Sequence, residues 1–305
     1  MGLPAKLVRA QLNFFKPFVA NCSLEITRKG QDKLGELMEA IHRRDVIVRD
    51  HDFGPFQGAW IMPKDERRQG VVLYLHGGGY TCGNLDYAKG FAATLSDECG
   101  VRVFCAAYRL APEDRFPAAL DDAVVSYQYL LSKGYPASQI LLCGESAGGG
   151  LCAAVCIKAR DTGEVNVAFQ MPLYPMLDDR DTETSRDNHG RVWNTWKNHF
   201  GWRCYLRGTD RETLPPYAAP ARVENMEGLP PAYTFVSTGE PFYAETLEYI
   251  RRLKDCGIPA SADVYETDMH AFDMMHPKDA LSIEAARRFN ESFAYVQEHY
   301  FAPQK

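Results

Sequence analysis

Two kinds of hydrophobic pattern alternate along most of this 305-residue chain. Short, uniformly apolar runs such as Val71–Leu75 are typical of strands that are buried on both faces. Longer segments such as Tyr87–Glu98 repeat apolar positions at helical spacing. The expected strands are Val46–Arg49, Ala59–Met62, Val71–Leu75, Val101–Ala106, Ile140–Cys143, Val165–Gln170, Tyr233–Ser237 and Ala262–Tyr265. The expected helices are Tyr87–Glu98, Pro117–Ser132, Leu151–Arg160, Tyr243–Lys254 and Asp279–Tyr300.

The order of these elements predicts the fold class. Strands that alternate with helices favour the α/β class, here a mostly parallel eight-stranded sheet with helices on both faces. Only the short turn Asp50–Pro55 separates the first two strands, which favours an antiparallel hairpin at that edge. The hydrophobic content of 46% is ample for one large core.

Two segments do not follow this alternation. Residues 1–43 show helical spacing, which predicts two helices before the first strand. Residues 178–220 form a long, charged and aromatic insertion between the sixth and seventh strands. An insertion of this length is typical of a lid over a functional site. We therefore expect a core of residues 44–177 and 221–305 and a helical cap of residues 1–43 and 178–220.

The most informative motif is Gly144-Glu-Ser-Ala-Gly148, which reads G-x-S-x-G. It lies between the expected strand Ile140–Cys143 and the expected helix Leu151–Arg160. A strand, a tight turn with serine at its apex and a helix form a nucleophile elbow. Ser146 is therefore the candidate nucleophile for attack on a carbonyl carbon.

A second motif, His76-Gly77-Gly78-Gly79, directly follows the expected strand Val71–Leu75. An H-G-G-G turn after a strand presents backbone N–H groups to a developing oxyanion. Glycine allows the main chain to approach a ligand closely. The two motifs together, in this order, predict a serine hydrolase.

A serine hydroxyl needs a base to remove its proton, and in this arrangement the base follows the last strand. His270 comes after the expected strand Ala262–Tyr265, and His276 is its nearest competitor. The acid comes after the preceding strand, and Glu240 lies just beyond Tyr233–Ser237. A carboxylate there can hold the other ring nitrogen of the base. Other carboxylates remain open as the acid: Glu245, Asp263 and Asp268.

These motifs give the chain a resemblance to a known family. His76 to Gly79 matches H-G-G-G, and Tyr108-Arg-Leu-Ala-Pro-Glu113 matches the longer and more specific Y-R-L-A-P-E. Gly144 to Gly149 resembles G-D-S-A-G-G, and Met269-His-Ala-Phe272 resembles the segment H-G-F around a family histidine. Over most of its length the chain resembles the hormone-sensitive-lipase family of esterases with the α/β-hydrolase fold.

The resemblance implies a cap built from the N-terminal helices and the insertion before the seventh strand. It also implies an oxyanion hole formed by Gly77, Gly78, Gly79 and Ala147, with the amides of the last three as donors. His76 is expected to shape this loop. The chain departs from the family pattern at two carboxylates. Glu240 stands where the family usually has Asp, and Glu145 replaces the more frequent Asp beside the nucleophile.

The cap is expected to choose the substrate. The insertion carries Trp193, Trp196, Phe200, Trp202 and Tyr205. An aromatic run of this kind favours an apolar acyl or alcohol pocket, although the same side chains could serve only to attach the cap to the core. The expected roof consists of the N-terminal phenylalanines and four candidate substrate-binding residues: Asn188, Trp193, Trp196 and Tyr205.

Composition narrows the function classes. The net charge of −6 is spread without a Lys/Arg block, which argues against nucleic acid as a partner. No apolar stretch approaches the ~20 residues of a membrane span, and Lys16 and Pro17 interrupt the N-terminal apolar run, which favours an amphipathic helix over a signal peptide. The nine cysteines form no C-x-x-C pair, which favours reduced thiols and a cytoplasmic location.

The sequence thus predicts hydrolysis of carboxylic esters with short or medium acyl groups through a Ser-His-acid triad and an acyl-enzyme. We expect a small-molecule ester as substrate and no metal or cofactor, because the histidines lack paired-ligand spacing. A homodimer is compatible with the sequence. The alternatives are an amidase or formamidase with the same triad, and a non-catalytic ligand receptor on the same fold.

Overall fold

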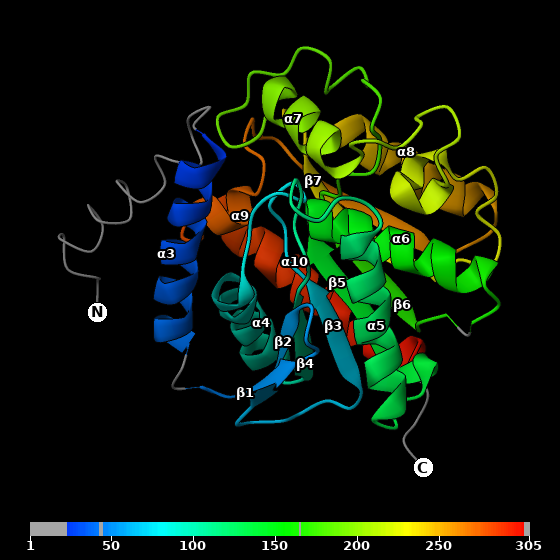
Figure 1. Ribbon diagram of the computed structural model, residues 1–305. Coiled ribbons are helices and arrows are strands. Elements are labelled where there is room, and N and C mark those ends of the chain that lie inside the picture. Colours follow the sequence, from blue (N-terminus) through cyan, green and yellow to red (C-terminus); the bar gives the residue numbers. More distant parts are fainter. Residues whose placement is uncertain (1–22, 43–44, 165, 302–305) are drawn as a thin grey trace.

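An eight-stranded sheet forms the centre of the computed structural model, which describes residues 23–42, 45–164 and 166–301 (Figure 1). Its spatial order is β1-β2-β4-β3-β5-β6-β7-β8. The pairs β1–β2 and β2–β4 are antiparallel and the other pairs are parallel, so the predicted fold class is confirmed. The strands are β1 (Val46–Asp52), β2 (Gln57–Pro63), β3 (Val71–Leu75), β4 (Arg102–Ala107), β5 (Ile140–Glu145), β6 (Phe169–Leu173), β7 (Ala232–Ser237) and β8 (Ala260–Tyr265).

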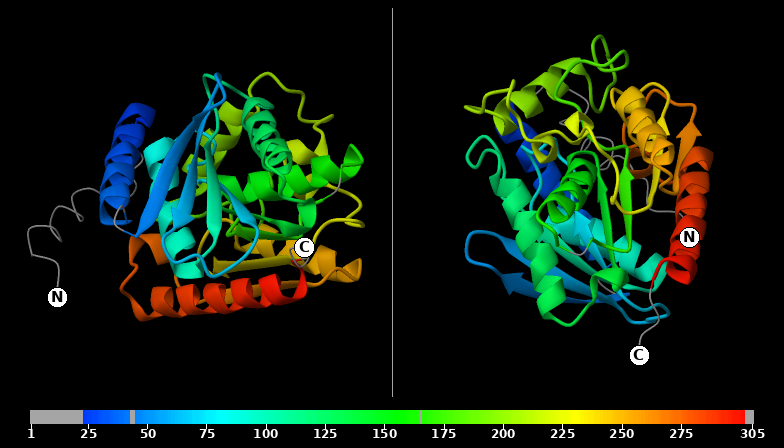
Figure 2. Two further views of the ribbon diagram at one scale, coloured as in Figure 1. Left: turned by 90° about the horizontal axis from the view of Figure 1, so that it is seen from below. Right: turned by 90° about the vertical axis from the view of Figure 1, so that its right-hand side faces the viewer.

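Helices cover both faces of the sheet, which explains the uniformly apolar central strands. Along β3, Val71, Leu73 and Leu75 pack into one core cluster, whereas Val72 and Tyr74 pack into the cluster on the opposite face. The first cluster lies under α5 (Ala118–Ser132), α6 (Ala147–Asp161) and α8 (Tyr243–Asp255). The second lies under α4 (Leu85–Cys99) and α10 (Ala280–His299), and α10 runs across that face in Figure 2.

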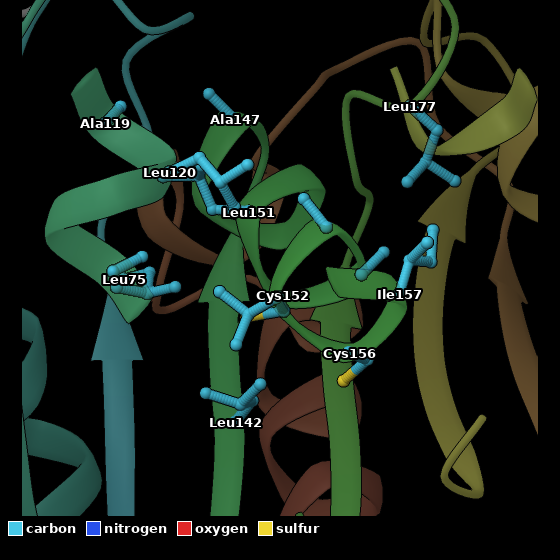
Figure 3. Packing of buried hydrophobic residues seen from close by; sticks show 14 of the residues in the cluster. Leu75, Ala119, Leu120, Leu142, Ala147, Leu151, Cys152, Cys156, Ile157 and Leu177 are labelled. Carbon is cyan, nitrogen blue, oxygen red and sulfur yellow. The ribbon is translucent and has the colours of Figure 1, made fainter. Parts of the chain in front are cut away.

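The helix α6 fixes the position of the nucleophile motif. Figure 3 shows its side chains, including Leu151 and Cys152, packed beside Leu142 of β5 and Leu75 of β3. Leu151 and Cys152 are fully buried, and small residues in the first turn let the helix approach the sheet closely. The start of α6 is therefore held rigidly at the carboxyl end of β5.

Some element boundaries differ from those expected. The first strand extends to Asp52 because its antiparallel ladder continues to the pair Asp52–Gln57. The sixth strand begins later than expected, at Phe169. Just before it, the Asn166 side chain donates a hydrogen bond to the Cys156 carbonyl oxygen at 2.9 Å, which ties this segment to α6. Position 165, where that strand was expected to start, lies outside the described residues.

The expected cap segments lie beside and above the sheet. The helix α3 (Leu24–His42) stands next to α4, and α7 (Thr195–Tyr205) lies above the carboxyl ends of the central strands (Figure 1). Two 3-10 turns, at 216–218 and 220–222, and α9 (Phe272–Met275) complete this side of the molecule. The first expected helix lies outside the described residues, and the division into core and cap stays a prediction.

Within residues 23–42, 45–164 and 166–301, no helix combines the length and the apolar character needed to cross a membrane.

Candidate active site

Ser146 occupies a strained turn between β5 and α6. Its backbone φ of 55° and ψ of −119° lie outside the regions that non-glycine residues normally adopt. Strain of this kind is typical of functional sites. At Gly148, an added Cβ would overlap the carbonyl oxygens of Leu75 and His76. The glycine therefore lets the H-G-G-G loop lie directly against the elbow, as the motif requires.

The structure brings Ser146, His270 and Glu240 together. His270, between β8 and α9, places its Nε2 atom 3.0 Å from Ser146 Oγ. Its Nδ1 atom contacts Glu240 Oε2, which follows β7. The other oxygen, Glu240 Oε1, accepts the Ser237 N–H at 2.9 Å. All three catalytic candidates are nearly inaccessible to solvent, with exposed fractions of 5%, 5% and 1%.

The competing residues have other partners. Glu245 accepts the backbone N–H groups of Leu177 and Asp178 at 2.6 and 3.2 Å. Asp263 pairs with Arg288 on the outside of the sheet. Glu245 and Asp263 therefore do not contact the His270 ring and do not serve as the acid. His276 does not replace His270 as the base, because its half-exposed ring lies 3.9 Å from Asp279. The backbone of Asp268 packs against Gly239, the residue before Glu240. Among the described residues, no hydrogen bond or ion pair joins the Asp268 side chain to His270.

His76 is a structural part of the oxyanion loop. Its ring is fully buried and stacks on Tyr108 with a centroid distance of 4.3 Å. The Tyr108 hydroxyl donates to the His76 carbonyl oxygen at 2.6 Å. Burial lowers the pKa of His76 to about 4, so the ring is uncharged at neutral pH. This ring therefore shapes the loop and carries no charge to the site.

Gly77 differs from its predicted role. Its N–H donates to Glu145 Oε1 at 2.6 Å and is therefore not available to an oxyanion. The amides of Gly78, Gly79 and Ala147 have no acceptor among the described residues. The Ala147 amide is at the first turn of α6, where N–H groups lack partners within the helix. These three amides remain as candidate oxyanion donors.

Glu145 is the part of the site that sequence reasoning missed. Its side chain is buried, and besides the Gly77 amide it accepts the Tyr74 hydroxyl at 2.7 Å. Burial raises the pKa of Glu145 to about 8, although both hydrogen bonds act in the opposite direction. The carboxyl ties the oxyanion loop to β3. Its only signal in the sequence was its place beside the nucleophile.

A cavity of about 320 Å³ opens onto Ser146, His270 and Gly78. Trp193 and Trp196 line it, as expected of the roof. The lining also includes residues that were not predicted, on and beside α3 and α9: Ser23, Leu24, Thr27, Gln31, Met274 and Met275.

Asn188 and Tyr205, which were expected in the roof, do not line this cavity. Asn188 donates to the carbonyl oxygens of Thr184 and Gly239 and so holds its own loop beside that of Glu240. Tyr205 is buried and stacks on Tyr80 at 3.9 Å, which attaches α7 to the core. The N-terminal phenylalanines lie outside the described residues.

Comparison with known proteins places the chain in a family. A family model described as alpha/beta hydrolase fold matches residues 72–274. The chain belongs to this family. An acetyl-hydrolase of Streptomyces hygroscopicus is 31% identical over 253 residues, which are 82% of this chain and 81% of the relative.

The similar solved structures are esterases, which makes the family assignment more specific. An esterase from the bacterial hormone-sensitive lipase family is 27% identical, with a TM-score of 0.81 over 97% of this chain and 99% of that one. EstE5, from a crystal soaked with p-nitrophenyl butyrate, is 26% identical with a TM-score of 0.81, over 97% and 100% of the two chains. The predicted resemblance to the hormone-sensitive-lipase family is confirmed, and the chain is a carboxylic ester hydrolase of this α/β-hydrolase family.

Proposed function

We propose that the protein hydrolyses carboxylic esters with short or medium acyl groups, with Ser146 as nucleophile, His270 as base and Glu240 as the acid that orients His270. The observation that supports this most directly is the continuous contact from Ser146 Oγ through the His270 ring to Glu240. This contact holds the imidazole in the tautomer that can accept the serine proton.

In the proposed cycle, Ser146 Oγ attacks the ester carbonyl carbon while His270 Nε2 takes the hydroxyl proton. The carbonyl oxygen becomes an oxyanion and accepts hydrogen bonds from the amides of Gly78, Gly79 and Ala147. His270 then gives its proton to the departing alcohol. Water, deprotonated by His270, attacks the acyl-enzyme and releases the carboxylic acid.

The cavity supports the proposed acyl length. Its volume of about 320 Å³ is at the low end of the ~300–1,000 Å³ typical of small-molecule pockets. The aromatic residues Trp193, Trp196 and Phe200 are part of its lining. The acetyl-hydrolase name of one relative points to the same small acyl groups.

The test is a series of p-nitrophenyl esters from acetate to laurate, with p-nitrobutyranilide as the matched amide. We expect the highest kcat/KM on the shorter esters and a loss of more than about 10⁴-fold in the S146A variant. Ser132→Ala changes an exposed serine on α5 and serves as the matched control. Retention of activity in S146A would refute the mechanism, and faster cleavage of the anilide would favour an amidase.

A further inference from the structure

Aromatic side chains pack against the imidazole of His270, in addition to its two hydrogen-bond partners. The rings of Tyr174 and Phe242 each have their centroid 5.1 Å from that of the imidazole, at interplanar angles of 82° and 81°. Both residues are almost inaccessible to solvent, with exposed fractions of 1% and 0%. At this distance and angle, aromatic rings contact each other edge to face. The orientation of the imidazole therefore depends on two apolar neighbours that exchange no proton with it.

Tyr174 lies directly after β6, in a segment that also holds the backbone of the nucleophile. The Ser146 N–H donates to the Leu173 carbonyl oxygen at 3.0 Å, and the Ser146 carbonyl oxygen accepts the Met176 N–H at 2.9 Å. The Tyr174 N–H donates to the Phe235 carbonyl oxygen of β7 at 3.0 Å. The segment that carries this ring is thus fixed both to the nucleophile elbow and to the neighbouring strand.

The conformation of this segment is closely constrained. Tyr174 has a φ of 33°, a positive value that is rare for a residue with a bulky side chain and is typical of functional sites. An added Cβ on Gly150 would lie 2.3 Å from the Met176 carbonyl oxygen. A Cβ on Gly149 would lie 3.0 Å from Pro175 Cβ. The glycines after the nucleophile therefore let the segment lie directly against the first turn of α6, and packing at this density leaves the tyrosine ring little freedom.

A catalytic imidazole needs such support because its hydrogen bonds change during the reaction. In the proposed cycle Nδ1 stays in contact with Glu240, whereas Nε2 turns from Ser146 Oγ to the departing alcohol and then to water. A ring that is held at one atom only can tilt about that atom, and a misplacement of 1 Å can cost ~10²-fold in rate. Contact with fixed aromatic rings restricts this tilt without competing for either nitrogen.

From this packing we propose that Tyr174 and Phe242 are positioning residues, which hold the imidazole of His270 in place throughout the cycle. The proposal rests on the proposed function and adds to it two residues that do not touch the substrate. Neither lines the active-site cavity within the described part of the chain, so their replacement should change the chemical steps more than the binding of the ester. The Tyr174 hydroxyl lies 3.1 Å from Met274 Sδ and 3.4 Å from Asp273 Oδ2, and it is not required, because the ring supplies the contact with the imidazole.

The experiment measures kcat and KM on p-nitrophenyl butyrate for the wild type, Tyr174→Phe and Tyr174→Leu. We expect Tyr174→Leu to lower kcat by about 10–100-fold and to change KM less than about threefold, because the imidazole is misplaced while the cavity keeps its lining. Tyr174→Phe keeps the ring and should retain kcat to within about threefold. The conservative variant thus separates the contribution of the ring from that of the hydroxyl.

Tyr249→Leu is the matched control. Tyr249 of α8 is similarly buried, and its hydroxyl donates to Gln170 Oε1 at 3.0 Å. Among the residues that the structure describes, no hydrogen bond or ring contact joins it to the three catalytic candidates. This variant should lower the melting temperature and leave kcat unchanged. An equal loss of kcat in the control would show a general effect of destabilisation and would overturn the proposal.

The remaining outcomes separate this proposal from the proposed function. If Tyr174→Leu is folded and keeps kcat to within about threefold of the wild type, or loses activity mainly through KM, the ring does not position the base and the ester hydrolase remains. The same holds if Tyr174→Phe loses as much as Tyr174→Leu. If the wild type does not cleave p-nitrophenyl butyrate, the proposed function fails and this inference with it. If Tyr174→Leu does not fold, Phe242→Leu removes the other ring and decides the question by the same split between kcat and KM.

Discussion

Replacement of Glu145 by Gln should change how the stability of the protein depends on pH. Burial raises the pKa of this carboxyl from 4.5 to about 8. Between these values the folded protein retains a proton that the unfolded chain has released. The unfolded state therefore binds fewer protons, and the free energy of unfolding falls as the pH rises from about 5 to 8.

The magnitude follows from the two pKa values. One pKa unit corresponds to about 1.4 kcal/mol, so this carboxyl can remove at most roughly 4–5 kcal/mol of stability by pH 8 and above. An amide of the same shape can still accept the Gly77 N–H and donate to the Tyr74 hydroxyl oxygen, but it does not titrate. We therefore expect similar stability of the two proteins at pH 5 and a more stable E145Q variant at pH 8.

Urea unfolding of both proteins at pH 5, 6, 7 and 8 measures this difference. Asp273, whose pKa burial raises to about 6, titrates in the same direction but is present in both proteins, so most of its effect cancels. Glu224→Gln, at an exposed position, is the matched control and should run parallel to the wild type. Parallel curves for E145Q and the wild type would refute the assigned pKa.

Three further substitutions test other parts of the site. Glu240→Gln should lower kcat on p-nitrophenyl butyrate by roughly 10⁴-fold with little change in melting temperature, because an amide can hold His270 in the wrong tautomer; less than a tenfold loss would assign the acid elsewhere. Gly148→Ala should reduce both melting temperature and activity, because its methyl group would overlap backbone oxygens that cannot move independently, and an unchanged melting curve would contradict the close approach. Arg28→Met removes the contacts of α3 with Glu113, Thr81 and Ala111, so hydrogen exchange in α3 should speed up and KM should rise several-fold; unchanged exchange would show that other contacts hold the helix.

The sequence was most informative where a short motif has a fixed structural setting. The G-x-S-x-G and H-G-G-G patterns each follow a buried strand, and that order alone leads to Ser146 and to the glycine loop. Chain order after β7 and β8 likewise pointed to Glu240 and His270, which the structure brings into contact. The residues come together because strand ends in a parallel sheet meet at one edge, and their catalytic roles stay a prediction.

Sequence reasoning was weaker wherever a role depends on packing between distant segments. Gly77 could not be separated from its neighbours, because its amide is occupied by a carboxyl 68 positions away. Aromatic character did not distinguish Trp193, which lines the cavity, from Tyr205, which is buried in the core. Gln31, which lines the cavity, and Tyr174, which packs against the candidate base, carried no motif.

The position of α3 has a consequence for how selectivity can be altered. Ser23, Leu24, Thr27 and Gln31 all belong to one short continuous stretch, whereas the reacting groups sit on separate loops behind different strands. One part of the cavity wall is thus encoded apart from the reacting groups, while the roof around Trp193 and Trp196 is encoded in the insertion. We expect exchange of this single stretch between relatives to alter which esters enter, with the catalytic side chains themselves unchanged.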